Sequence, residues 1–273
     1  VLLCGRISSM MVRVGFTIYF AHELTKAEFA TLAIFEIMGA LNNMLSNFGL
    51  ETYCLREVPF LIENKERSKA AALIKTAVTN RVICSTVIGL LILCFAHELA
   101  ELFFKDNAYS NVIRILSIGV VMFSINTSME LIANAIKAFK EVAVVNFMVT
   151  LSFCAVSFTL YHFIGFKGWV TGISVSGVVG SVLFFLLLKR WLFHSGGLYP
   201  WIKMVRKSFA FYVRGFARFG FVRLDHAVIG IFLTPGSLAT YYVAKRFPGY
   251  ISILMHAVEK PLMAKISESK NTG

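Results

Sequence analysis

Residues Gly168–Leu188 read GWVTGISVSGVVGSVLFFLLL and contain no charged side chain. A membrane-spanning helix needs about 20 mostly apolar residues, so this stretch is long enough to cross a bilayer. Its small residues Gly168, Gly172, Ser176 and Gly180 recur every four positions, which places them on one helical face. Small residues at that spacing let a neighbouring helix approach closely, so the stripe predicts helix packing rather than a ligand contact.

The rest of the chain resembles this stretch in composition. Of its 273 residues, 57% are hydrophobic and 15% are charged, whereas about 25% are charged in a typical soluble domain. Reading outward gives further apolar runs, so that the candidate spans are residues 2–21, 29–55, 71–96, 109–135, 142–164, 168–188, 209–233 and 237–258. The sequence therefore predicts an all-α, polytopic membrane protein with about eight transmembrane helices.

The basic residues are distributed unevenly between the connections. The chain has 27 Lys and Arg against 15 Asp and Glu, a net charge of +12. Every second connection is basic, and this set holds 14 Lys and Arg in Arg56–Lys69, Lys137–Lys140, Lys189–Lys207 and Lys260–Lys270. By the positive-inside rule these connections are cytoplasmic, and an even number of spans puts both termini there too. The charge is thus mainly a topology signal, and we expect no nucleic-acid binding.

The sequence offers no pattern typical of catalysis or of metal binding. Its five cysteines are isolated in or beside apolar runs, and its six histidines form no HExxH motif. No nucleophile stands beside a candidate base, and the connections of the less basic set are short. We therefore expect neither a metal site nor catalytic residues.

Charged and amide side chains inside the apolar runs are the candidates for chemistry. A charge within the bilayer is costly, so such residues normally face a protein interior or a water-filled cavity. They include Arg13 in the first run, Asn43 and Asn47 in the second, and Arg214, Arg218, Arg223 and Asp225 in the seventh. The excess of arginine predicts a cationic cavity for an anionic or heavily hydroxylated ligand. The alternative is that some arginines extend to the membrane interface. For Arg214 a position in the cavity and a position at the interface are equally favoured.

Two short segments of the chain repeat each other. Leu24–Thr31 reads LTKAEFAT and Leu233–Thr240 reads LTPGSLAT, and each follows an arginine-containing run. The offset of 209 residues corresponds to six predicted helices, as two parallel six-helix repeats would give. The expected organisation is a first lobe at residues 1–188, a cytoplasmic linker at 189–208, and the first two helices of a second lobe at 209–273.

Four motifs resemble the lipid-linked polysaccharide flippases of the multidrug/oligosaccharidyl-lipid/polysaccharide exporter superfamily, which includes O-antigen-type flippases. The motifs are Phe48-Gly49-Leu50-Glu51 with Leu55-Arg56-Glu57, Arg223-Leu224-Asp225 with the stretch 229–235, the stretch Leu238–Arg246, and Lys260-Pro261-Leu262. Members of this superfamily have a complete second lobe, so the resemblance implies that the chain is truncated.

The resemblance also implies a function. The chain would flip an undecaprenyl-pyrophosphate-linked oligosaccharide across the bacterial inner membrane by alternating access, without being an enzyme and with a proton or Na⁺ as the coupling ion. Arginine suits a pyrophosphate because its fork of donors matches phosphate oxygens. The expected substrate-binding residues are Arg13, Asn43, Asn47, Arg218, Arg223 and Asp225, and the expected gate or loop residues are Glu51, Arg56, Glu57, Lys245 and Arg246.

The expected partners are the lipid bilayer, the lipid-linked oligosaccharide, and a complex of polysaccharide polymerase and glycosyltransferases. Two other functions are compatible with the sequence. A cation-coupled drug antiporter of the same superfamily would need a carboxylate-rich site, whereas the embedded charges here are mainly arginine. A membrane polymerase or acyltransferase acting on lipid-linked glycans would need catalytic groups near the interface.

Overall fold

The structure is a computed structural model that describes the backbone of residues 2–245 and, within them, all side chains except those of residues 2–10, 13, 218 and 221–223. The elements of the described part are helices, namely α1 (Leu2–Glu23), α2 (Lys26–Asn47), α3 (Leu50–Glu63), α4 (Arg67–Cys94), α5 (Ala96–Phe104), η1 (Asn107–Tyr109), α6 (Ser110–Ala135), α7 (Phe139–Ile164), α8 (Phe166–Leu192), α9 (Trp201–Phe232) and a helix at residues 235–245. The prediction of an all-α fold is confirmed.

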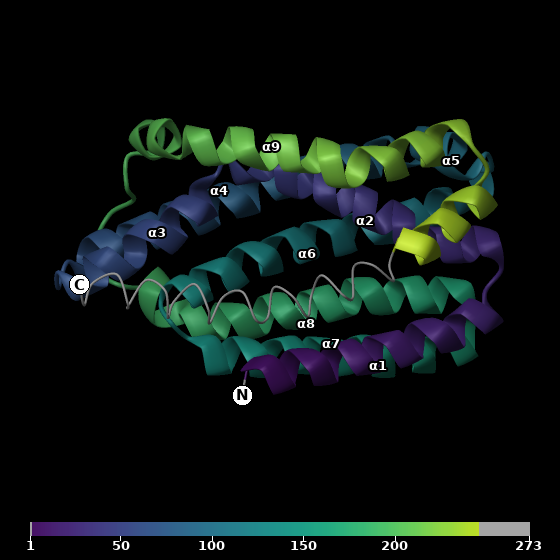
Figure 1. Cartoon of the computed structure of the whole chain (residues 1–273), viewed down its shortest axis with the longest axis horizontal. Coiled ribbons are helices and arrows are strands. Elements are labelled where there is room, and N and C mark those ends of the chain that lie inside the picture. Colours follow the sequence, from purple (N-terminus) through teal and green to yellow (C-terminus); the bar gives the residue numbers. More distant parts are fainter. Residues whose placement is uncertain (1, 246–273) are drawn as a thin grey trace, which may run out of the picture.

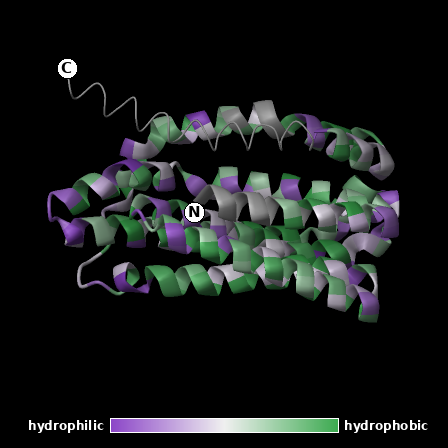
Figure 2. Cartoon of the chain, turned by 60° about the horizontal axis from the view of Figure 1, so that its bottom comes forward, coloured by the Kyte–Doolittle hydropathy of each residue, from purple (hydrophilic) through white to green (hydrophobic). Residues whose placement is uncertain are grey.

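The long helices lie side by side along the long axis of the molecule (Figure 1). The α6, α7 and α8 helices pack together, α1 packs on α7, and α9 packs on α2 and α3 on the other side of the bundle. The connections α3–α4, α6–α7 and α8–α9 lie at one end, which we call the basic end. Hydrophobic residues predominate along the middle of the helices in Figure 2.

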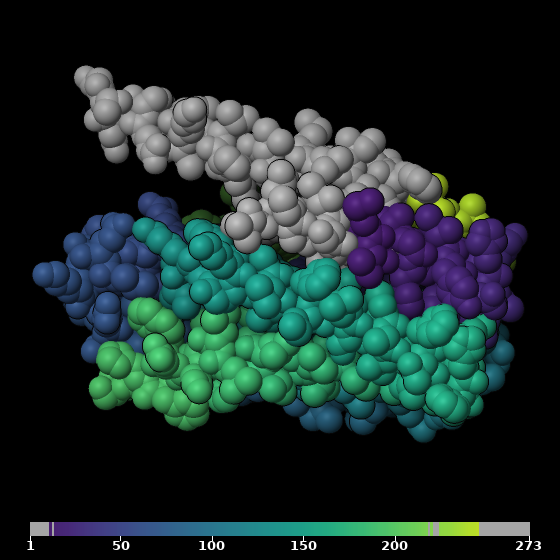
Figure 3. Space-filling view, turned by 90° about the horizontal axis from the view of Figure 1, so that it is seen from below, coloured from purple at the N-terminus to yellow at the C-terminus, as the bar shows by residue number. Residues whose placement is uncertain are grey.

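Five helical stretches within the described residues are long and apolar enough to span a membrane. They are Lys26–Asn47, Arg67–Cys94, Asn107–Ala135, Phe139–Ile164 and Phe166–Leu192. The surface formed by α7 and α8, seen in Figure 3, exposes large apolar side chains such as Val144, Met148 and Leu186, as a lipid-facing surface does. The chain is a polytopic membrane protein. The predicted runs 2–21 and 209–233 lie in α1 and α9, and the run 237–258 extends beyond the described residues.

The predicted run 29–55 is not one helix. The chain breaks at Phe48 and Gly49, which have φ angles of 49° and 74° in the left-handed region. A Cβ atom at Gly49 would lie 2.5 Å from the Ser208 carbonyl oxygen and 2.7 Å from the Tyr212 nitrogen. Glycine is therefore required both for its conformation and because the α9 backbone approaches here. Average hydropathy does not reveal such a break, nor does it show that the chain stays helical after it. Most of the expected connection 56–69 therefore lies in α3 and α4.

The connection between α8 and α9 is shorter than the expected linker. It spans residues 193–200, because α8 continues to Leu192 and α9 begins at Trp201. Hydrogen bonds fix it to α4: Lys75 Nζ donates to the Gly196 carbonyl at 2.9 Å, and Thr76 Oγ1 donates to the Tyr199 carbonyl at 3.1 Å. The division of the chain into lobes stays a prediction.

The two repeated segments make equivalent helix–turn–helix junctions. Before each turn, the Leu24 and Leu233 nitrogens both donate to the carbonyl four residues earlier at 2.9 Å. After it, Thr25 and Thr234 cap the next helix, accepting from the Glu28 nitrogen at 3.3 Å and the Ser237 nitrogen at 3.2 Å. Pro235 is the first residue of the helix at 235–245, a position where its missing N–H is not needed.

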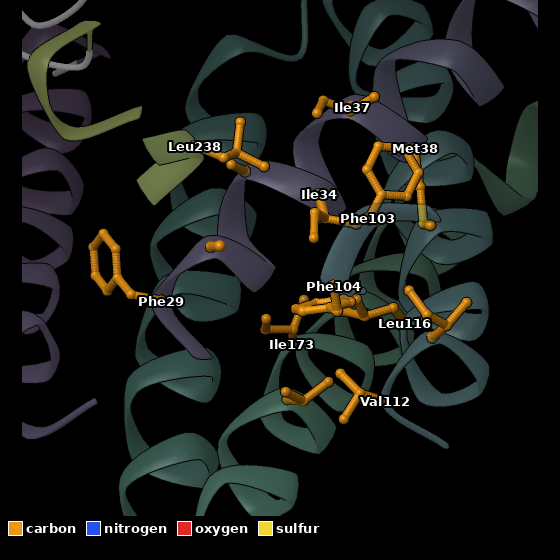
Figure 4. Close-up of a cluster of buried hydrophobic side chains, with 14 of the residues drawn as sticks. Phe29, Ile34, Ile37, Met38, Phe103, Phe104, Val112, Leu116, Ile173 and Leu238 are labelled. Carbon is orange, nitrogen blue, oxygen red and sulfur yellow. The ribbon is translucent and has the colours of Figure 1, made fainter. Parts of the chain in front are cut away.

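Two clusters of apolar side chains form the core. In the first, shown in Figure 4, α2, α5, α6 and α8 contribute Ile34, Phe103, Leu116 and Ile173. The second lies between α3, α4, α6 and α8 and includes Met204 of α9. The glycine stripe of α8 packs against neighbouring helices as predicted. A Cβ atom at Gly172 would lie 2.0 Å from Ser157 Oγ of α7, and one at Gly180 would lie 2.6 Å from Asn126 Nδ2 of α6.

Candidate functional site

A buried arginine forms the centre of a polar network inside the bundle. Arg81 lies midway along α4, about 20 Å from either end at a rise of 1.5 Å per residue. Its Nε donates to Glu51 Oε1 of α3 at 2.7 Å, and both side chains are 1% exposed. Its Nη1 donates to Ser46 Oγ at 2.6 Å, Ser124 Oγ at 3.1 Å and Asn43 Oδ1 at 3.2 Å. Paired in this way, the buried charges are stabilised.

Amide groups extend this network across the bundle. Asn42 Nδ2 of α2 donates to Ser85 Oγ of α4 at 2.8 Å. Asn80 Nδ2 donates to the Ser46 carbonyl at 3.1 Å, and the Asn80 Oδ1 accepts from Trp201 Nε1 of α9 at 3.0 Å. The network therefore joins α2, α3, α4 and α6 to the beginning of α9, at the place where α2 breaks at Gly49.

This network contains two of the residues singled out from the sequence, Asn43 and Glu51, and a third, Asn47, lies one turn along α2 from Asn43. The Asn43 side chain accepts from Arg81 and from Ser124, and Glu51 pairs with Arg81 in the first turn of α3. Asn47 is half-buried, and its Oδ1 has no hydrogen-bond partner within the described residues. Asn43 and Glu51 are thus engaged in internal contacts in this conformation.

Sequence reasoning missed Arg81, the residue that organises this network. It lies inside the predicted run 71–96 and obeys the same rule that singled out Arg13 and Arg223, namely that a charge embedded in an apolar run has a partner or a function. The run is so apolar on average that one arginine does not interrupt it.

A second polar cluster lies between α9 and the helix at 235–245. The Asp225 carboxylate forms an ion pair with Lys245 and accepts from the Tyr241 hydroxyl at 2.5 Å. Its Oδ1 lies 2.9 Å from Nδ1 of His226, which is 2% exposed. The Asp225 and Lys245 side chains are 35% and 34% exposed, so this pair is accessible, unlike Arg81 and Glu51.

The helix at 235–245 also contacts α2. The Tyr242 hydroxyl donates to Glu36 Oε1 at 2.7 Å, and the Tyr242 ring lies 6.3 Å from that of Phe29. Tyr242 is 2% exposed. One face of this short helix thus contacts α9 through Tyr241 and Lys245, and an adjacent face contacts α2 through Tyr242.

The remaining residues predicted from the sequence lie elsewhere. At the basic end, Arg56 is exposed on α3, and the half-buried Glu57 lies close to Tyr53 and Lys207. Arg13 lies in α1, and Arg218 and Arg223 lie in α9, but the side chains of all three are outside the described part of the structure. Arg246 lies wholly outside it.

A pocket of about 510 Å³ lies at the start of α9, away from Asp225. Its lining includes Ile83 and Cys84 of α4 and Leu198 and Trp201 on the other side. The amide of Asn80 and the hydroxyl of Thr76 also line it, but both already hydrogen-bond to the protein. The pocket therefore offers mainly apolar surface.

Comparison with known proteins identifies the family. No curated protein and no solved structure matches the chain. A family model described as "Polysaccharide biosynthesis protein" matches residues 20–272, which include both polar clusters. A match over most of the chain agrees with the function class that the sequence motifs suggest. The chain belongs to the polysaccharide biosynthesis protein family, as a polytopic helical membrane protein.

Proposed function

We propose that the chain translocates an undecaprenyl-pyrophosphate-linked oligosaccharide across the bacterial inner membrane for surface polysaccharide synthesis. One observation carries this proposal: in a membrane protein of a polysaccharide biosynthesis family, the Asp225–Lys245 pair is half-exposed within the helical bundle. It lies on α9, whose only acidic residue is Asp225 and which also carries Arg214, Arg218 and Arg223. Ionisable residues inside a membrane mark the path of a polar substrate.

The chemistry of the substrate fits these residue types. A pyrophosphate carries several negative charges, and the always-charged guanidinium groups of Arg13, Arg218 and Arg223 are our candidates for binding it. Lys245 adds an ammonium group whose partner is a carboxylate that an anionic ligand can replace. The amide groups of Asn43 and Asn47 suit sugar hydroxyls, and Asn43 becomes available only if the Arg81 network rearranges.

Alternating access and its coupling fit the same place. We propose that the coupling ion, a proton or Na⁺, acts at Asp225. Neutralising this carboxylate weakens its hold on Lys245 and thereby frees the helix at 235–245 to move relative to α9. The Tyr242–Glu36 hydrogen bond would transmit that movement to α2. The protein acts here as a transporter and not as an enzyme, with a polymerase and glycosyltransferases as its partners.

The experiment uses cells that lack the full-length gene and carry it back on a plasmid. Wild-type protein should restore surface polysaccharide, and Asp225→Asn should leave lipid-linked oligosaccharide accumulated on the cytoplasmic side at equal expression. Asp106→Asn is the matched control, because Asp106 is an exposed carboxylate that only caps a turn. Normal surface polysaccharide with Asp225→Asn contradicts the assignment of the site. Purified protein that turns over the lipid-linked sugar, or takes up a cationic dye instead, contradicts the function.

A further inference from the structure

Helix α9 has three distinct faces. At 100° per residue, Met204, Ser208, His226 and Gly230 fall within about 80° of one another and are buried against the bundle. A second face carries exposed large apolar side chains, namely Ile202, Phe209, Val213 and Phe216. The third face carries Lys203, Lys207, Arg214 and Asp225 within about 40° of one another.

The third face is cationic until it reaches Asp225. The side chains of Lys203, Lys207 and Arg214 are all exposed. Lys207 lies close to the Tyr53 hydroxyl of α3, which places this part of the face beside α3 at the basic end. Asp225 is the only carboxylate on α9, and its charge is already balanced by Lys245. The positive charge of the three residues before it therefore has no acidic counterpart on the same helix.

The depth of these residues suits a lipid headgroup. Helix α9 spans Trp201–Phe232 and is about 48 Å long, longer than the roughly 30 Å hydrocarbon core of a bilayer. Lys203 and Lys207 lie in its first two turns, at the basic end, whereas Asp225 lies about 10 Å from its other end. Arg214 stands between them. The charged face therefore runs from the basic end, through Arg214, along most of the length of α9.

The two exposed faces of α9 cannot have the same environment. The face with Phe209 and Val213 suits lipid tails, whereas a row of charges facing hydrocarbon would be costly. The charged face must border water or an anionic ligand.

We propose that Lys203, Lys207 and Arg214 form an entry track that captures the diphosphate of a polyprenyl lipid and directs it towards the Asp225–Lys245 pair. This inference rests on the proposed function and adds to it three residues and a direction of approach. It also predicts that the track selects a polyprenyl diphosphate over an ordinary anionic phospholipid, because a diphosphate carries more negative charge than the phospholipid headgroup.

The test measures binding of fluorescently labelled undecaprenyl diphosphate to the full-length protein in phosphatidylcholine nanodiscs. A basic residue at a membrane surface strengthens binding of an anion roughly fivefold, so the triple variant Lys203→Ala/Lys207→Ala/Arg214→Ala should bind about 100-fold more weakly. The matched control is Arg206→Ala, because Arg206 is an exposed arginine of α9 on the side of the apolar face. It should stay within about twofold of wild type, and labelled undecaprenol should bind all variants alike.

Three results would overturn the entry track. They are unchanged binding by the triple variant, an equal loss in Arg206→Ala, and equally strong competition by phosphatidylglycerol, which would indicate an ordinary lipid contact. A circular dichroism melt matching wild type shows that the triple variant is folded. A translocation assay distinguishes the proposed function from the entry track. If the wild type and the triple variant flip lipid-linked oligosaccharide equally fast, the entry track is contradicted and the proposed function is not. If wild type binds the diphosphate along α9 but never translocates it, the proposed function fails and the binding site stands.

Discussion

The two ion pairs inside this bundle differ in what surrounds them. Arg81 and Glu51 are 1% exposed, and Arg81 also donates to serine and asparagine side chains of α2 and α6. Asp225 and Lys245 are about one-third exposed and connect α9 to the helix that follows it. A buried pair within a hydrogen-bond network that links several helices is positioned to hold those helices together. An accessible pair at the junction of two helices can exchange its partner for a ligand, so the comparison assigns stability to the first and function to the second.

The largest effect should come from breaking the buried pair on one side. Arg81→Ala leaves the Glu51 carboxylate buried without its cation, which should lower the free energy of unfolding by about 3–5 kcal/mol. Thermal unfolding in detergent, followed by circular dichroism, measures this loss. Lys69→Ala is the control, because it breaks the exposed Lys69–Glu66 pair and should cost less than about 1 kcal/mol. Equal effects of the two substitutions would contradict the structural role of Arg81.

The next effect concerns the break that brings α9 to this network. Gly49→Ala places a Cβ in the left-handed region and against the α9 backbone, which should cost about 2–4 kcal/mol. Gly215→Ala in α9 is the matched control, since a Cβ there meets nothing within 4 Å and alanine favours a helix. The same unfolding measurement applies, and a neutral Gly49→Ala would show that α9 does not pack as closely as the structure has it.

A smaller effect distinguishes two adjacent tyrosines. Tyr242→Phe removes the hydroxyl that donates to Glu36 from a side chain that is 2% exposed, and should cost about 1–2 kcal/mol. Tyr241→Phe removes a donor from the accessible Asp225 and should cost less than about 1 kcal/mol, yet it should slow transport more. The measurement compares melting temperature and transport rate in the two variants: Tyr242→Phe should lose more stability, and Tyr241→Phe should lose more transport. A larger stability loss in Tyr241→Phe would go against it.

The sequence predicts the helices of this protein better than their junctions. The apolar runs locate the long helices because a spanning helix needs sustained hydropathy, and the repeated Leu-Thr segments correctly indicate equivalent turns. The left-handed Phe48 and Gly49 are invisible to hydropathy, since two residues in an apolar stretch do not change its average. The α9 backbone that requires Gly49 lies about 160 residues away in the chain, as the Ser208–Phe48 hydrogen bond shows, and one sequence cannot predict that contact.

The candidate residues show the same division. Asp225 and Lys245 stand out as charges in apolar runs, but their pairing depends on a turn that brings residues 20 positions apart together. Arg81 escaped notice because its run is otherwise apolar, although the rule for embedded charges applies to it equally. Glu51 was singled out through a motif, and only the packing of α3 against α4 identifies its partner.

The most direct test measures translocation of a fluorescent lipid-linked oligosaccharide by the full-length protein in proteoliposomes, per folded molecule. It compares Asp225→Asn with the double variant Glu51→Leu/Arg81→Met, which replaces the buried pair by apolar side chains and so avoids an unpaired charge. We predict that Asp225→Asn lowers the rate at least about tenfold without loss of stability, and that the folded double variant stays within about threefold of wild type. A normal rate in Asp225→Asn together with an inactive but fully folded double variant would contradict the assignment of function to the accessible pair.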